Sequence, residues 1–273
     1  MRKLLLIEWD KIRSYRAFWI IISLYLFLLI AAVAGLPAFL HYITDKINAS
    51  VFIKLFTHLL LGFPDVWQNI AFFAGNRAFI KLLLAILIII LVSNEFTYHT
   101  VRMNIISGLS RYQFLLAKVE LILAFSLLST IILFLSGLYV GFENSRTISI
   151  QSVLGNLYFL PAYFTELFTY LCFALMIGVI IRKTGFAIIT LLIYLVVEPI
   201  IQYYLPDQFD KYLPMNAMNH IVWSVNTTDL TFRTPEFNIP LQQDISVSDV
   251  IVCIGYAAVF LTLVWLSLQK KDL

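Results

Sequence analysis

Charged residues are scarce in this chain. They make up 13% of its 273 residues, whereas hydrophobic residues make up 61%. Soluble domains carry about 25% charged and about 45–50% apolar residues, so this composition excludes an ordinary soluble domain. It predicts a protein that crosses the membrane several times. Because the apolar runs are long and continuous rather than alternating, we expect an all-α polytopic membrane protein and not a β-barrel.

The chain also lacks the motifs that mark nucleotide-binding and catalytic sites. No Gly-Lys pair occurs anywhere, so there is no P-loop. There is no His-Glu-x-x-His zinc motif and no Gly-x-Ser-x-Gly nucleophile motif. Cys172 and Cys253 lie in apolar runs and are expected to be buried small hydrophobes. We therefore expect no enzyme activity, cofactor or metal in this chain, and its dispersed net charge of +3 predicts no nucleic-acid binding.

Six apolar runs are long enough to cross a membrane as helices, which need roughly 20 residues each. The predicted spans are Ala17–Leu36, Ala78–Ser93, Val119–Val140, Tyr163–Ile181, Gly185–Tyr204 and Asp249–Leu268. The second is the weakest because Arg77 and Lys81 lie at its start; its helix could begin earlier, and we expect both cations to point outward to water. Arg182–Thr184 alone joins the fourth and fifth spans, which predicts a tight antiparallel hairpin.

Lysine and arginine concentrate on one side of these spans. With the N-terminus inside, most of the 19 lysines and arginines face the cytoplasm, as the positive-inside rule requires. The others are spread over longer outer segments. We therefore expect a single transmembrane domain over residues 1–273 in the inner membrane of a bacterium, with both termini cytoplasmic.

The outer segment 205–248 is the least apolar part of the chain and holds four of its eight prolines. It is either an extracytoplasmic cap with short re-entrant helices or a loose loop. Glu198 precedes Pro199 near the outer end of the fifth span, where the proline predicts a kink or a helix end. Glu198 is either a wetted helix end or a polar group at the outer mouth of a transport pathway.

Residues 1–16 predict an amphipathic helix that lies in the membrane interface. Leu5, Trp9 and Ile12 form an apolar stripe, which Glu8 and Arg16 interrupt. Trp9 is expected at the depth of the lipid headgroups. The alternative is a basic flank that only orients the first span.

Residues 94–110 predict a short helix between the second and third spans. Phe96, Thr100, Met103 and Ile106 fall near one helical face, and Gly108 ends the pattern. This cytoplasmic helix either rests on lipid headgroups or docks a soluble partner and transmits force into the membrane.

The helix that continues into the third span is predicted to begin at Arg111. Ser110 is followed three residues later by Gln113, which is the spacing of a capping box. A new helix should therefore start directly after the turn at the end of segment 94–110.

The N-terminal sequence EWDKIRSYRAFW, the six spans and the polar helix between spans two and three resemble the permease subunit of type-2 ATP-binding-cassette transporters. In that family a Glu after the second span is followed by Gly-Thr, a Ser-Arg pair and a Lys that enters the third span. Glu95, Thr100, Ser110-Arg111 and Lys118 match in this order. The family Gly is replaced here by His99.

The resemblance implies an exporter in which two permease subunits, identical or homologous, form the transmembrane core. Each would dock one cytoplasmic ATPase through the inner helix, here called the coupling helix. ATP and Mg²⁺ would be bound by that ATPase and not by this chain. We expect Glu95, Arg102, Met103 and Arg111 at the docking surface.

Two other functions stay open. A scaffold or assembly factor would hold a soluble partner through the same helix without transport. A secondary carrier is less favoured, because the centres of the predicted spans hold no row of carboxylates.

Overall fold

The computed structural model describes residues 2–46, 61–77, 80–106, 108–145, 148–224, 233–234, 237–238, 242 and 244–270. Six helical segments of this part of the chain are long and apolar enough to cross a membrane. The spanning helices are α2 (Arg16–Lys46), α5 (Ile80–Thr97), α7 (Arg111–Asn144), α9 (Phe159–Ile181), α10 (Thr184–Tyr204) and α13 (Val247–Lys270). The prediction of an all-α polytopic membrane protein is confirmed.

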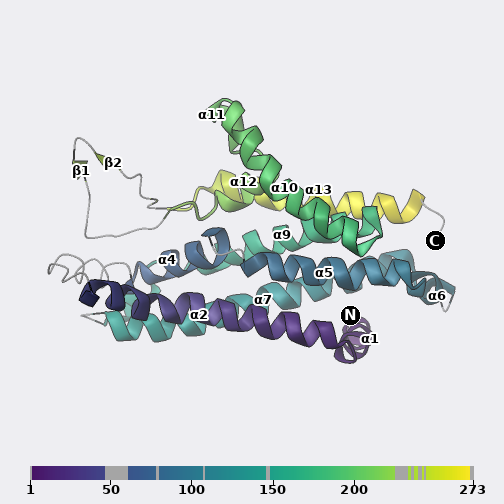
Figure 1. Cartoon of the computed structure of the whole chain (residues 1–273), viewed down its shortest axis with the longest axis horizontal. Coiled ribbons are helices and arrows are strands. Elements are labelled where there is room, and N and C mark those ends of the chain that lie inside the picture. Colours follow the sequence, from purple (N-terminus) through teal and green to yellow (C-terminus); the bar gives the residue numbers. More distant parts are fainter. Residues whose placement is uncertain are drawn as a thin grey trace.

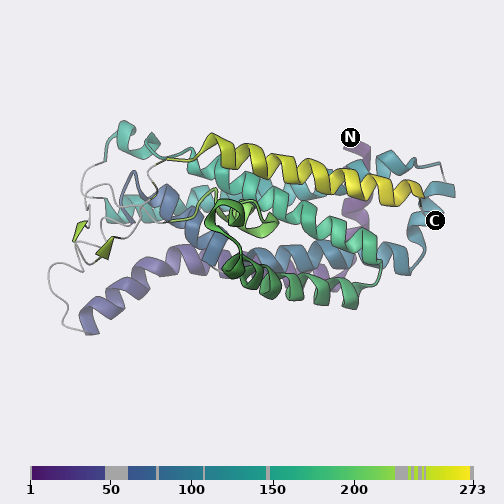
Figure 2. The same ribbon diagram turned by 90° about the horizontal axis from the view of Figure 1, so that it is seen from above.

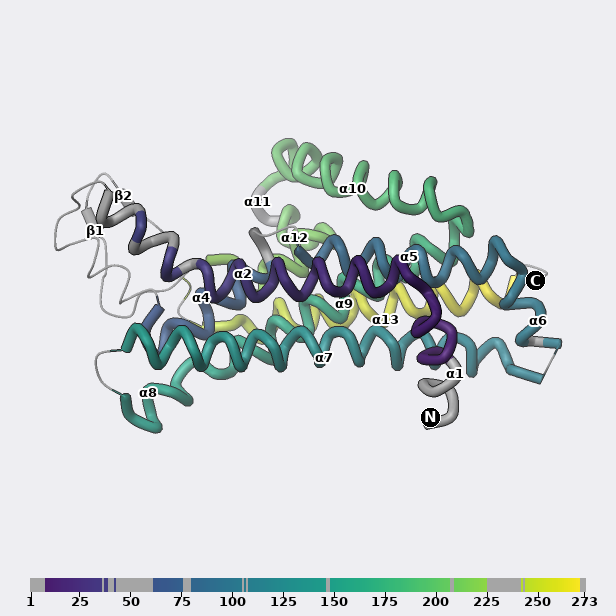
Figure 3. The backbone as a smooth tube through the Cα atoms, turned by 60° about the horizontal axis from the view of Figure 1, so that its bottom comes forward, coloured from purple at the N-terminus to yellow at the C-terminus, as the bar shows by residue number. Residues whose placement is uncertain are grey.

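The spanning helices run lengthwise beside one another (Figures 1 and 2). α9 lies at the centre and packs against α5, α7, α10 and α13. α10 leans away from the other helices toward α11 (Asp207–Asp210), as Figures 1 and 3 show. The N-terminus, the C-terminus and α6 (Thr100–Ile106) lie at one end of the bundle, here called the α6 end. The opposite end, which carries α4 (Val66–Phe72), is called the α4 end.

Local sequence signals set the helix boundaries at the α6 end. The Ser110 Oγ accepts a hydrogen bond from the Gln113 backbone N–H at 3.1 Å, and the Gln113 side chain accepts from the Ser110 N–H at 2.9 Å. This capping box starts α7 at Arg111, as predicted. Between α9 and α10 only Arg182 and Lys183 are non-helical, so the predicted tight hairpin is also confirmed.

At the α4 end, a buried helical segment precedes the second span. All seven residues of α4 are buried, and the π-helical turn η1 (Phe73–Arg77) follows it. α4 approaches α7 closely because Gly137 has no side chain: a Cβ there would overlap Ile70 and Trp67. The Trp67 indole N–H donates to the Val153 carbonyl at 2.7 Å, next to the end of α8 (Ile150–Leu154). The spanning helix α5 itself begins at Ile80, close to the predicted start at Ala78, and α4 with η1 is a separate helical segment before it.

The described part of the outer segment folds onto the bundle as a cap. α12 (Pro214–Asn219) packs against α9 and α13. Gln68 donates through Nε2 to the carbonyls of Ser224 and Gln242, which fixes the cap to α4. Strands β1 (Arg233–Thr234) and β2 (Phe237–Asn238) form a two-residue antiparallel ladder.

Candidate functional site at the α6 end

Three buried charged side chains and one exposed lysine hold the α6 end together. The Lys118 Nζ, in α7, lies 2.6 Å from Glu8 Oε2 and 2.7 Å from Glu95 Oε1. Glu8 belongs to α1 (Arg2–Arg13) and Glu95 to the end of α5. The more exposed Lys11 Nζ lies 3.3 Å from Glu8 and 3.5 Å from Glu95. One lysine with two carboxylate partners thus links α1, α5 and α7; we call these four residues the ion cluster.

The charges in the ion cluster compensate one another. Burial alone would raise the pKa of Glu8, but the charges of Lys118 and Lys11, with their hydrogen bonds, bring this pKa below its ordinary value. Glu8 therefore stays ionised although it is only 4% exposed. A buried charge of this kind is tolerated because it is paired and hydrogen-bonded.

The ion cluster explains how α1 lies on the bundle. Ile12 and Glu8 are buried against the bundle, whereas Trp9 is 46% exposed, so Trp9 and Ile12 of the predicted stripe do not share one buried face. The carboxylate that interrupts the stripe therefore forms the main polar contact of α1 with α7. The side chain of Leu5 lies outside the described residues.

Glu95 was predicted as a docking residue. The structure places it at 9% exposure, with Oε1 paired to Lys118 and Lys11. Its first role is thus to bind helices within the chain, and its docking role stays a prediction.

α6 presents an exposed surface at this end. Met103 is 66% exposed and Ile106 is 73% exposed. Arg102, also on α6, is exposed and lines the pocket described below. The prediction that Phe96 shares a face with Met103 is wrong. His99 adopts a left-handed backbone with φ 56°, which ends α5 and redirects the chain, so Phe96 is buried while Met103 faces outward.

Arg111 fixes the beginning of α7 to the end of α13. Its Nη1 donates to the carbonyls of Leu268 and Gln269 at 2.7 and 2.8 Å. A guanidinium at a helix C-terminus satisfies carbonyls that have no partner within the helix and interacts favourably with the helix dipole. Arg111 is therefore half-buried in a structural contact, and its predicted docking role is untested.

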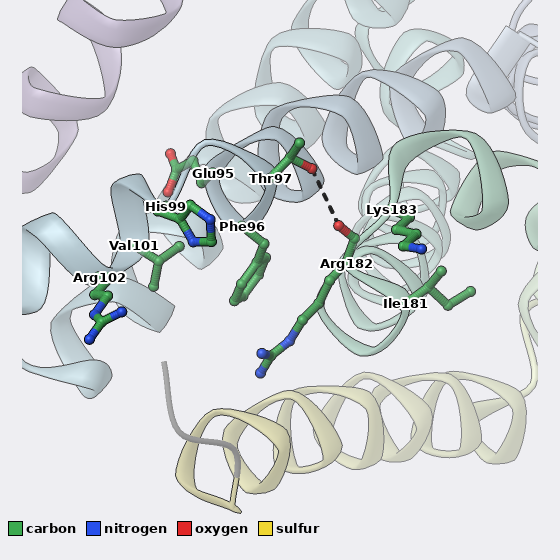
Figure 4. Close-up of a pocket in the computed structure, with 9 residues that line it drawn as sticks. All are labelled: Glu95, Phe96, Thr97, His99, Val101, Arg102, Ile181, Arg182 and Lys183. Carbon is green, nitrogen blue, oxygen red and sulfur yellow. Dashed lines mark hydrogen bonds between the residues drawn. The ribbon is translucent and has the colours of Figure 1, made fainter.

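A pocket of about 740 Å³ lies beside α6 (Figure 4). One wall is formed by residues of the α5–α6 region and the other by the α9–α10 turn. The lining residues are Glu95, Phe96, Thr97, His99, Val101, Arg102, Ile181, Arg182 and Lys183. The Arg182 guanidinium lies 4.8 Å from the centre of the Phe96 ring, and the Thr97 hydroxyl donates to the Arg182 carbonyl at 3.5 Å.

A second buried ion pair lies toward the α4 end. The Lys81 Nζ is 2.6 Å from Glu166 Oε1 and donates to Asn219 Oδ1 at 2.8 Å. The expectation that Lys81 points outward to water is therefore wrong, because a carboxylate partner on α9 keeps the lysine inside at 8% exposure. The side chain of Arg77 lies outside the described residues.

Glu198 also differs from the expectation of a wetted helix end. It is 3% exposed, and its carboxylate accepts the backbone N–H groups of Met215 at 3.0 Å and Asn216 at 2.6 Å. Glu198 thus satisfies the first N–H groups of α12. α10 continues through Pro199 to Tyr204, so the helix does not end at the proline. A role of Glu198 at an outer pathway is untested.

Sequence reasoning did not connect Glu8 and Lys11 with the ion cluster, or Arg182 and Lys183 with the pocket. A signal was present, because the chain has few charges and these four flank apolar runs. In the described ranges, no three His, Cys, Asp or Glu side chains gather where they could hold a metal ion.

A family model described as a protein of unknown function (DUF2705) matches residues 61–273. The chain belongs to the DUF2705 family. The match covers α4 to α13, and hence α6 and its pocket, but not α1. No curated protein matches the chain.

Proposed function

We propose that this DUF2705 protein is the transmembrane permease subunit of an ATP-binding-cassette exporter. It lies in the inner membrane of a bacterium with the α6 end in the cytoplasm. A separate subunit binds ATP and Mg²⁺ and hydrolyses ATP. The observation that carries the proposal is α6 itself, a short helix that exposes Met103 and Ile106 while its flanking helices are joined by the ion cluster.

The ion cluster gives α6 a route for transmitting force. α6 lies between α5 and α7 in the chain, and Lys118 bonds the end of α5 to α7 and α1 through Glu95 and Glu8. Separating these partners would leave buried charges without compensation, which is costly. A push on α6 by a bound ATPase would therefore move the ends of α1, α5 and α7 as one unit.

The exposed apolar helices suit a membrane and a second permease copy. In the most apolar 18-residue stretch of α10, only 17% of the residues are buried within the chain. In that of α13, 22% are buried. Lipid, or the same helices of an identical or homologous subunit, would cover the remainder. The second subunit would complete the transport pathway between the two chains.

Co-purification from native membranes in mild detergent tests the docking surface. Met103→Glu should reduce the amount of bound ATPase, because it places a charge in the centre of the exposed apolar surface of α6. Ile150→Glu is the matched control, since Ile150 is 82% exposed on a short helix at the α4 end. Arg102→Glu should act like Met103→Glu. If both α6 variants retain the ATPase as well as Ile150→Glu does, α6 is not the docking element.

The same preparation separates the other two candidates. A scaffold would retain a soluble partner without ATPase activity. A secondary carrier would purify without any nucleotide-binding subunit. The carrier has one specific observation in its favour, which is the buried Lys81–Glu166 pair between α5 and α9.

A further inference from the structure

We propose that the pocket between α6 and the α9–α10 turn is a binding site for a phosphate group. Its charge is the first reason. Arg102, Arg182 and Lys183 line it, and none of the three forms an ion pair within the described residues. The lining carboxylate, Glu95, is already paired with Lys118 and Lys11 and does not offset them. Three unpaired cations around one concave surface attract anions.

The second reason is the state of the Arg182 guanidinium. Its Nε and Nη2 atoms are shielded from solvent and have no hydrogen-bond acceptor in the described part of the chain. These two nitrogens form the edge through which arginine binds two oxygens of one oxyanion at once. Buried donors are normally satisfied, so an acceptor is missing here. A small rotation of the side chain would turn this edge to the cavity that Arg182 lines.

The third reason is the position of Arg182 at the pocket. Its Cζ lies 4.8 Å from the centre of the Phe96 ring, a cation–π contact at the wall of the pocket. The Arg182 backbone is left-handed with φ 60°, a conformation that favours glycine. Arg182 is the C-cap of α9, a position where left-handed residues are common and glycine is usual, so glycine can replace it.

The number of cations favours phosphate over carboxylate. A carboxylate offers two oxygens and one charge, and the edge of Arg182 alone would use both oxygens. A phosphate carries more charge and more oxygens than a carboxylate, which suits a pocket whose lining also holds Lys183 and Arg102. The phosphate could belong to a lipid headgroup at the membrane surface or to a soluble compound, and both sources present the same chemistry to the pocket.

Two variants test the site in the full-length protein. Arg182→Gly removes the guanidinium and suits the left-handed backbone, so the chain should still fold. Lys183→Ala removes the neighbouring ammonium. Lys211→Ala is the matched control, because Lys211 lies 5.2 Å over the Tyr212 ring much as Lys183 lies 5.9 Å over Phe186.

Binding is measured with two probes. The first is inorganic phosphate, titrated in detergent at constant ionic strength against chloride and acetate, with the thermal unfolding midpoint as readout. The second is phosphatidic acid in phosphatidylcholine nanodiscs, with retained lipid detected by native mass spectrometry. Loss of a bidentate charged contact should weaken binding by roughly tenfold or more in Arg182→Gly. Lys211→Ala should bind like the wild type.

The outcomes separate the two sources and the alternatives. A soluble source is identified if inorganic phosphate binds, Arg182→Gly weakens that binding and Lys211→Ala leaves it unchanged. Selective retention of phosphatidic acid identifies a lipid. Acetate that binds as well as phosphate would overturn the proposal in favour of an acidic side chain of a protein partner. Absence of binding to both probes, or equal binding by Arg182→Gly, would also overturn it.

The phosphate site and the docking surface share Arg102, so Arg182 and Met103 are the residues that separate the two proposals. Arg182→Gly should lose phosphate binding while ATPase co-purification persists, and Met103→Glu should show the reverse. Loss of both properties in Arg182→Gly would make the pocket part of the docking surface and reject a separate phosphate site.

Discussion

The ammonium group of Lys118 lies 2.7 Å from the carboxylate of Glu95, and both side chains are buried. Glu8 provides a second carboxylate at 2.6 Å from the same nitrogen. A lysine at 1% exposure inside a membrane protein is tolerated only when such partners compensate its charge. The beginning of the third spanning helix is therefore fixed to α5 and to α1 by electrostatic contacts rather than by apolar packing alone.

Replacing Lys118 with Met should strongly destabilise the protein. The two carboxylates of Glu8 and Glu95 would remain buried near each other, and loss of one partner of a buried ion pair costs about 3–5 kcal/mol. The free energy of unfolding in detergent, followed by circular dichroism during denaturant titration, measures the effect. The triple variant Glu8→Gln, Glu95→Gln, Lys118→Met should recover much of the loss, because no buried charge of the cluster remains and Lys11, which loses its partners, is exposed.

Lys211→Met is the control for Lys118→Met. Lys211 is exposed, and substitutions at exposed sites usually change stability by less than about 0.5 kcal/mol. If Lys118→Met and Lys211→Met unfold at the same denaturant concentration, the ion cluster does not stabilise the fold.

The ion cluster should also make the folding stability depend on pH. Folding lowers the pKa of Glu8 below its ordinary value of 4.5, so the unfolded chain binds this proton more tightly than the folded chain. The stabilisation from Glu8 is thus fully present above pH 4.5 and is lost as the pH falls through the lower folded pKa. Thermal unfolding midpoints between neutral and acid pH should fall less steeply in Glu8→Gln than in the wild type.

Glu143→Gln is the matched control for this pH dependence, since Glu143 is exposed near the other end of α7. The thermal unfolding midpoint of Glu143→Gln should fall with pH as steeply as that of the wild type. If the midpoint of Glu8→Gln falls equally steeply, another group causes the loss of stability in acid.

Local signals in the sequence predicted the helices well. The boundary at Arg111 depends on Ser110 and Gln113, three residues apart, and their contact is present. The hairpin between α9 and α10 follows from a link of a few residues between two apolar runs. Such features are readable because their causes lie within a few residues.

Long-range charge pairs were not predictable in the same way. Glu8 and Lys118 are 110 residues apart, and Lys81 and Glu166 are 85 residues apart. A sequence shows that burial of one charge is costly, which led to the wrong expectation that Lys81 points outward. It does not show which distant helix supplies the compensating carboxylate, because that depends on how the helices pack.

Gly75→Ala should destabilise the region around the Lys81–Glu166 pair. A Cβ on Gly75 would lie 2.7 Å from Glu166 Oε2, and Glu166 cannot move freely because its other oxygen is 2.6 Å from Lys81. Overpacking of this kind costs about 1–3 kcal/mol. Denaturant unfolding in detergent should show that loss.

The comparison for Gly75→Ala is Gly255→Ala in α13, where no atom lies within 4 Å of the added Cβ. Alanine is favoured over glycine in helices, so Gly255→Ala should be neutral or stabilising by up to about 1 kcal/mol. Equal behaviour of the two variants would mean that the carboxylate of Glu166 is free to move.

His99→Gly should stabilise the chain without weakening the ATPase docking proposed above. His99 has φ 56°, and a left-handed conformation costs a residue with a side chain roughly 1–2 kcal/mol that glycine does not incur. The family pattern that the sequence resembles has glycine at this position, which agrees with the geometry of the turn. Thermal unfolding of His99→Gly should therefore occur at higher temperature, with ATPase co-purification unchanged.

Tyr98→Gly, an exposed neighbour without positive φ, should instead lower stability by about 0.5–1 kcal/mol. A loss of stability in both variants would show that the His99 side chain itself supports the turn into α6.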